Sequence, residues 1–120
     1  MKNSEIGRLG EAAAADYLRE TGYELLALNW RSGRYELDIV ARKEGELHLV
    51  EVKARRADGL TAPEDALTPH KQRALMHAAR AYVAWACWRG EVRFDLAAVD
   101  CRSDGSMQVR FVPDAMQCHW

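Results

Sequence analysis

The feature that most constrains this chain is residues 36–53, where two short apolar segments lie on either side of a turn sequence, Lys-Glu-Gly-Glu at 43–46. Because side chains alternate between the two faces of a strand, residues two positions apart share a face. A hairpin that turns at 43–46 would pair the segments antiparallel, with opposed side chains about 5 Å apart. The pattern therefore predicts that Asp38 and Glu51 meet, with Lys53 roughly 7 Å further along the second strand.

Two carboxylates beside an ammonium group suit the hydrolysis of a phosphodiester. This reaction places negative charge on the phosphate oxygens and needs an activated water. Paired carboxylates hold a hard cation, Mg²⁺ or alternatively Mn²⁺, which keeps water molecules available for the reaction. Lys53 would offset the repulsion between Asp38 and Glu51, and it could orient the water or bind the phosphate. The spacing therefore leads to the hypothesis of a metal-dependent nuclease.

Composition sets limits on this hypothesis. A chain of 120 residues suits one domain, expected over 1–120 with its core at 5–113 and a tail at 114–120. A formal net charge of −1 means that a nucleic-acid partner would need a local basic patch. No apolar run is long enough for a membrane span. We therefore expect a cytoplasmic protein with no membrane contact and no small-molecule cofactor.

Cysteine usage agrees with a reducing compartment. The chain has three cysteines, Cys87, Cys101 and Cys118, and their wide spacing contains no CxxC pair. An odd count at such spacing argues against a disulfide framework and against a cysteine metal site. Free thiols are the expectation.

The first of two expected helices spans 5–21. Ser4 is its expected N-cap, and Gly22 suits the position just beyond its last turn. Glu11 lies off the apolar stripe of this helix. From spacing alone, a solvated ion pair with Arg8 is a better explanation of Glu11 than a place in a site.

The second helix is expected to begin with Thr68 as N-cap and Pro69 at N1, and to run to about residue 88. Its basic side chains are His70, Lys71, Arg73, His77 and Arg80. Either a nucleic-acid surface or a solvated helix face would explain them. Lys71 lies one turn before Leu75 on the buried face, so it could reach the edge of the sheet near the predicted site.

The strands complete a mixed α/β sheet. They are expected at 23–31, 35–42, 46–55, 91–100 and 107–113, with a loop at 56–67. The order is therefore α-β-β-β-α-β(-β) in a single domain. The second helix connects two strands across the sheet, so it should pack on one face of a sheet that includes a parallel pair.

Several motifs resemble those of a known family. They are Gly10-Glu11, Asn29-Trp30-Arg31, Glu36-Leu37-Asp38-Ile39-Val40, Glu51-Val52-Lys53 and Arg93-Phe94-Asp95. Over about residues 5–100 the chain resembles the YraN-like bacterial proteins, within the PD-(D/E)XK nuclease superfamily and similar in fold to Holliday junction resolvases. The resemblance implies a restriction-endonuclease-like fold, in agreement with the order of elements.

The resemblance also implies a role for each matching residue. Asp38 and Glu51 would bind the metal, Lys53 would be the catalytic lysine, and Glu11 would complete the site from the first helix. The backbone carbonyl of Val52 would be a further ligand. Lys71 would contact a phosphate, and Arg55 is the second residue expected to contact nucleic acid. The implied activity is Mg²⁺-dependent endonucleolytic cleavage of DNA, including branched or structured DNA, by a homodimer.

Three hypotheses remain open at this point. The first is the endonuclease. The second is a catalytically silent module that binds nucleic acid or protein, which the near-neutral charge favours. The third is a structural network in which Asp38, Glu51 and Lys53 only neutralise one another. Tyr35 bears on the first hypothesis, because the family usually has glycine before Glu36 and a tyrosine would narrow the approach to Asp38.

Overall fold

The structure, a computed structural model, describes residues 2–57 and 63–117. Its helices are α1 (Asn3–Glu20), the short 3-10 helix η1 (Pro63–Ala66) and α2 (Pro69–Ala86). Its strands are β1 (Glu24–Ser32), β2 (Tyr35–Lys43), β3 (Glu46–Arg56), β4 (Val92–Cys101) and β5 (Met107–Met116). This order confirms the predicted α/β fold. Cys118 and part of the loop expected at 56–67 lie outside the described residues.

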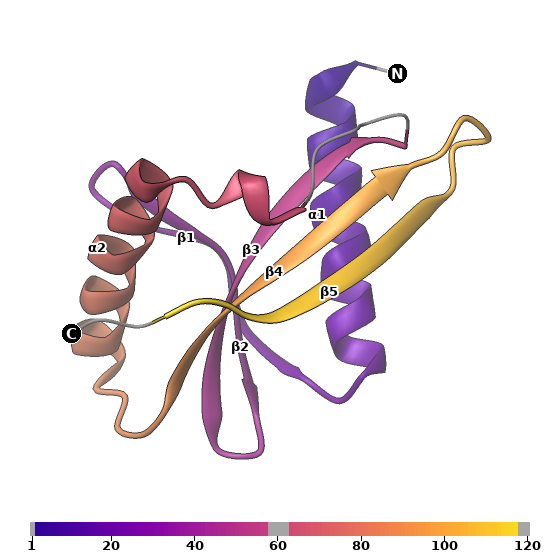
Figure 1. The fold of residues 1–120 in the computed structure, drawn as a ribbon. Helices are drawn as coiled ribbons and strands as arrows, with labels where there is room; N and C mark the ends of the chain where they lie inside the picture. The colour runs from indigo at the N-terminus through magenta and orange to yellow at the C-terminus, as the bar shows by residue number, and fades with distance from the viewer. Residues whose placement is uncertain (1, 58–62, 118–120) are drawn as a thin grey trace.

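The strands form one sheet in the order β1-β2-β3-β4-β5, in which β3 and β4 are parallel and the other pairs are antiparallel. A parallel pair needs a crossover connection, and α2 lies in the connection between β3 and β4. Figure 1 shows α2 beside β1 and β2, whereas α1 runs alongside β4 and β5 at another part of the sheet. Neither long helix of the described chain is apolar enough to cross a membrane.

The two central strands are buried on both faces. Leu49 of β3 and Leu96 of β4 belong to the core that includes α2. Their neighbours Val50 and Ala97 belong to the core that includes α1. Consecutive apolar residues are what a strand needs when helices cover both faces of the sheet. The sheet therefore separates α1 from α2.

The β2–β3 hairpin has the predicted turn and register. The turn residues at 44–45 have φ angles of 53° and 78°, as a two-residue type I′ turn requires. Ile39 and Val50 are the last pair of the ladder, counted from the turn. Asp38 and Glu51 follow this pair, at the point where the two strands separate. The local sequence therefore predicted this part of the fold correctly.

The start of α1 and the end of α2 differ from the predictions. α1 begins at Asn3 with Lys2 at the N-cap, so the assignment of Ser4 as N-cap was wrong. The backbone N–H of Lys2 donates to Oε1 of Glu5 at 3.4 Å, so the side chain of Glu5 satisfies a backbone donor at the start of the helix. α2 begins as predicted, but it ends at Ala86 because Cys87 adopts a left-handed conformation with φ of 53°.

β5 extends beyond its predicted end at Pro113 and reaches Met116, so it includes part of the expected tail. An edge strand tolerates proline where no ladder hydrogen bond is required of it. The register shifts at this place, because Leu96 pairs with Val112 while Phe94 pairs with Met116. Pro113 therefore lies in an irregular part of the strand.

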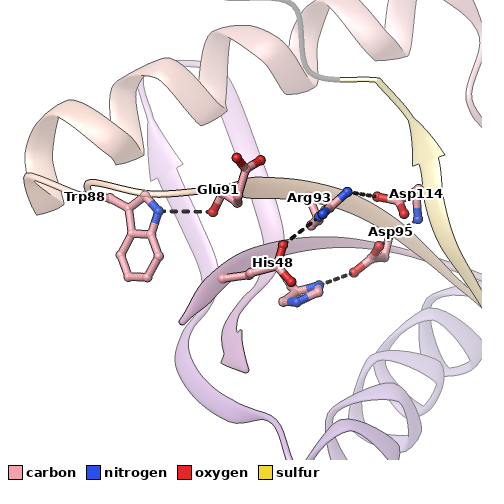
Figure 2. A network of polar contacts seen from close by, with 7 residues as sticks. His48, Trp88, Glu91, Arg93, Asp95 and Asp114 are labelled. Carbon is pink, nitrogen blue, oxygen red and sulfur yellow. Dashed lines mark hydrogen bonds and ion pairs between the residues drawn. The ribbon is translucent and has the colours of Figure 1, made fainter. Parts of the chain in front are cut away.

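A polar network holds this irregular part of β5 on the sheet, and Figure 2 shows its members. Asp95 is 3% exposed, and its carboxylate accepts the backbone N–H of Asp114 at 2.9 Å. Its second oxygen lies 2.7 Å from Nδ1 of His48 on β3. Arg93 lies 2.8 Å from Glu46 and 3.4 Å from Asp114. The buried carboxylate is therefore satisfied by contacts that join three strands.

Cysteine thiols are free where the structure describes them. Cys87 is exposed after α2, and Cys101 is buried at the end of β4. The expectation of free thiols is confirmed for these two residues.

Candidate metal centre

α1 lies close to β3 because Gly10 has no side chain. A Cβ atom at Gly10 would overlap the Cβ of Ala54. Ala14 and Leu18, one and two turns further along, are fully buried in the same interface. This close packing holds the adjacent Glu11, which is partly buried, against the sheet.

Three carboxylates come together at this place: Glu11 of α1 with Glu36 and Asp38 of β2. One oxygen of each lies within 4.8 Å of the others, and within residues 2–57 and 63–117 no other three acidic, histidine or cysteine side chains gather in this way. All three residues are partly buried. Carboxylate oxygens are the ligands that hard divalent cations prefer, so this carboxylate cluster has suitable chemistry for Mg²⁺.

Asp38 connects the carboxylate cluster to β3. Its Oδ2 accepts the backbone N–H of Val52 at 2.9 Å, where the ladder between β2 and β3 has ended. Glu51 is the neighbour of Val52, and the charge of Asp38 acts on it strongly enough to raise its pKa. The structure therefore places Asp38 near Glu51, as the hairpin spacing predicts, and near Glu11, as the resemblance implies. Glu51 adjoins the three-carboxylate group and is not a member of it.

Glu51 is the most perturbed acid of this region. Burial, and next the charge of Asp38, raise its pKa from 4.5 to about 8. Lys71 of α2 opposes this effect, with its Nζ 3.3 Å from Oε1 of Glu51. The Glu51 side chain is 12% exposed, and its buried Oε2 has no hydrogen-bond donor among the described residues. This oxygen is available to a cation or, in the absence of one, to a proton.

Asn29 of β1 positions two members of the carboxylate cluster. With its amide oriented to donate, the side-chain nitrogen lies 3.2 Å from Oε2 of Glu11 and 3.3 Å from Oε1 of Glu36. Burial and the charge of Asp38 raise the pKa of Glu11, and the Asn29 hydrogen bond acts in the opposite direction. Arg31 forms an ion pair with Glu36 at 2.8 Å. These contacts orient the acids without neutralising all of them.

The sequence reasoning missed Glu36 and Asn29 as site residues. Glu36 had a visible signal, because it stands two positions before Asp38 and so shares its face. Asn29 has φ of 52°, a conformation that asparagine adopts more readily than most residues. Its place beside α1 depends on how β1 lies in the sheet, which no local pattern records.

The other residues that the sequence singled out are not members of the carboxylate cluster. Lys53 follows Glu51 by two residues on β3 and is exposed. Arg55 lies 3.5 Å from Asp100, so an acid already offsets its charge. Tyr35, expected to narrow the approach to Asp38, stacks on His77 of α2.

Similar proteins cover most of this chain. Residues 10–99 match the model of the "Uncharacterised protein family UPF0102". A UPF0102 protein of Porphyromonas gingivalis is 45% identical over 104 residues, which are 87% of this chain and 77% of the relative. One of Bacteroides fragilis is 41% identical over 110 residues, 92% and 90% of the two chains. A third, of Nitratidesulfovibrio vulgaris, is 47% identical over 97 residues, 80% and 72% of the two chains. The matched region includes the carboxylate cluster, Glu51 and Lys53, and the chain belongs to the UPF0102 (YraN-like) family.

Proposed function

We propose that this protein is a metal-dependent endonuclease that hydrolyses phosphodiester bonds of DNA. The carboxylate cluster of Glu11, Glu36 and Asp38, with Glu51 beside it, is the observation that supports this proposal. Acids this close to one another, with raised pKa values at Glu11 and Glu51, favour the binding of a divalent cation such as Mg²⁺ or Mn²⁺. The unpartnered Oε2 of Glu51 suits the same ligand.

The neighbouring residues would orient the ligands and the substrate. The Val52 N–H fixes the carboxylate of Asp38, and Asn29 can fix Glu11 and Glu36. When bound, a divalent cation stabilises charge on the phosphate and lowers the pKa of water. The exposed ammonium of Lys53 would bind a phosphate oxygen or orient the attacking water. Val52 and Asn29 lie within hydrogen-bond distance of the carboxylate cluster, and Lys53 follows Glu51 by two residues on β3.

A cleavage assay on linear, flap and four-way-junction DNA, with Mg²⁺ or Mn²⁺, tests this proposal. We expect wild-type protein to cleave at least one substrate, and we expect Asp38→Asn and Lys53→Met each to reduce the rate by about 100-fold or more. Asp16→Asn is the matched control, because Asp16 is exposed on α1 in an ion pair with Arg19. Isothermal titration should show Mg²⁺ binding that Asp38→Asn weakens.

Two results would contradict the nuclease proposal. Activity that survives in both Asp38→Asn and Lys53→Met would exclude these residues from catalysis. DNA binding that needs no divalent cation, without cleavage of any substrate, would support the binding module that keeps the fold and lacks the reaction.

A further inference from the structure

α2 presents a stripe of basic side chains on its exposed face. His70, Arg73, His77 and Arg80 follow one another at three- or four-residue spacing, and all four residues are exposed. Side chains at this spacing share one face of a helix. The sequence of α2 contains no aspartate or glutamate. The helix therefore carries a local positive surface, although the formal net charge of the chain is −1.

The turn between β1 and β2 forms the other wall of a groove along this stripe. Arg34 and Tyr35 line a hollow of about 370 Å³ together with His70, Arg73 and His77. The rings of Tyr35 and His77 are stacked, with centroids 4.8 Å apart and planes at 13°. The Arg34 guanidinium lies 5.2 Å from the centroid of the Tyr35 ring and donates to the Tyr35 hydroxyl at 3.0 Å.

The stripe borders a further hollow at one end, and a contact with Glu51 lies near its other end. A second hollow, of about 440 Å³, shares Arg73 and His77 and extends to Arg80. At the other end, Lys71 is the neighbour of His70 and contacts Glu51 at 3.3 Å. We call these two hollows together the basic groove, which is bounded by Arg34, Tyr35, His70, Arg73, His77 and Arg80.

We infer that the basic groove binds the phosphodiester backbone of duplex DNA next to the bond that is cleaved. This inference rests on the proposed function. From His70 to Arg80 the helix rises about 15 Å, which corresponds to roughly four base-pair steps of a duplex. Arg34 and Arg73 line the groove from opposite walls and supply charge for phosphate contacts, and the rings of Tyr35 and His77 stack between the two elements. The groove supplies the local basic patch that a near-neutral nuclease requires.

Binding without cleavage tests this inference separately from the chemistry. Fluorescence anisotropy of a labelled 20-base-pair duplex would be measured in EDTA, over a range of salt concentrations that starts at about 20 mM. Arg34→Ala and Arg73→Ala should each weaken binding about threefold and lower the slope of log K against log salt by about 1. Arg19→Ala removes an equal charge from an exposed position on α1 and should change neither quantity. Circular dichroism confirms that the variants remain folded.

The outcomes for the groove and for the nuclease are distinguishable. If wild-type protein does not bind the duplex, or if Arg34→Ala and Arg73→Ala bind as tightly as Arg19→Ala, the inference is wrong whatever the cleavage assay shows. If the two variants lose binding while no DNA is cleaved with Mg²⁺ or Mn²⁺, the groove stands and the nuclease proposal fails. The same variants would be titrated with labelled polyglutamate. If Arg34→Ala and Arg73→Ala weaken binding to polyglutamate and leave DNA binding unchanged, the groove binds acidic protein segments and the inference is overturned.

Discussion

Glu51 provides a quantitative test of the electrostatics of the site. Its pKa is raised from 4.5 to about 8, first by burial and second by Asp38, and Lys71 offsets only part of this effect. Between about pH 4.5 and pH 8, Glu51 is therefore protonated in the folded protein and ionised in the unfolded chain. Because the native state then holds more protons, the metal-free protein should lose stability as the pH rises through this interval.

The size of the effect follows from the same pKa. One pKa unit corresponds to about 1.4 kcal/mol, so the displacement from 4.5 to about 8 sets an upper limit of about 5 kcal/mol. We expect roughly 2–3 kcal/mol, because water and structural relaxation reduce the cost of a buried charge. Glu51→Gln keeps the shape of the side chain and removes its charge. It should stabilise the metal-free protein by this amount at pH 8–9, which raises the Tm by about 10 °C.

Urea and thermal unfolding in EDTA at pH 5, 7 and 9 measure this prediction. The advantage of Glu51→Gln should be greatest at pH 9 and small at pH 5, where the folded wild-type protein carries a neutral Glu51. Glu20→Gln removes a charge from an exposed position at the end of α1 and should show no such trend. Added Mg²⁺ should stabilise wild-type protein more than Glu51→Gln. If Glu51→Gln destabilises the protein at pH 9, the contact with Lys71 is a stabilising ion pair and the predicted strain at Glu51 is wrong.

Three further predictions concern packing and support of the site. Gly10→Ala should destabilise the protein by about 1–3 kcal/mol in urea unfolding, because the new Cβ would overlap Ala54. Gly7→Ala is the control: a Cβ there has nothing within 4 Å, and the change should stabilise the protein by about 0.5–1 kcal/mol. Equal effects of the two changes would contradict the close packing of α1. Asp95→Asn should cost about 1–3 kcal/mol in the same assay, and a cost no greater than that of the exposed Asp16→Asn would show that the network around His48 contributes nothing. Asn29→Ala should weaken Mg²⁺ binding about tenfold in calorimetry by releasing Glu11 and Glu36, and an unchanged affinity would remove Asn29 from the site.

Features that depend on neighbouring residues could be predicted from the sequence. The glycine in the turn and the alternation of side chains specify the β2–β3 register, so the approach of Asp38 to Glu51 follows from residues within one hairpin. The start of α2 was predictable for the same reason, since the Thr68 side chain accepts the N–H of Lys71 at 3.2 Å. The end of β5 was wrong because a distant contact intervenes there: beside Pro113, the backbone of Asp114 donates to the carboxylate of Asp95 on β4.

The composition of the carboxylate cluster needed the tertiary structure. Both Glu36 and Glu51 flank Asp38 in the hairpin, and the alternation of side chains does not say which of them meets Glu11. That outcome depends on how closely α1 packs on β3 at Gly10 and on where β2 and β3 separate. The basic groove likewise joins the β1–β2 turn to α2, more than thirty residues later in the chain. Local hydrogen bonding and side-chain alternation act over a few residues, whereas the docking of helices on a sheet depends on the shape of the whole core.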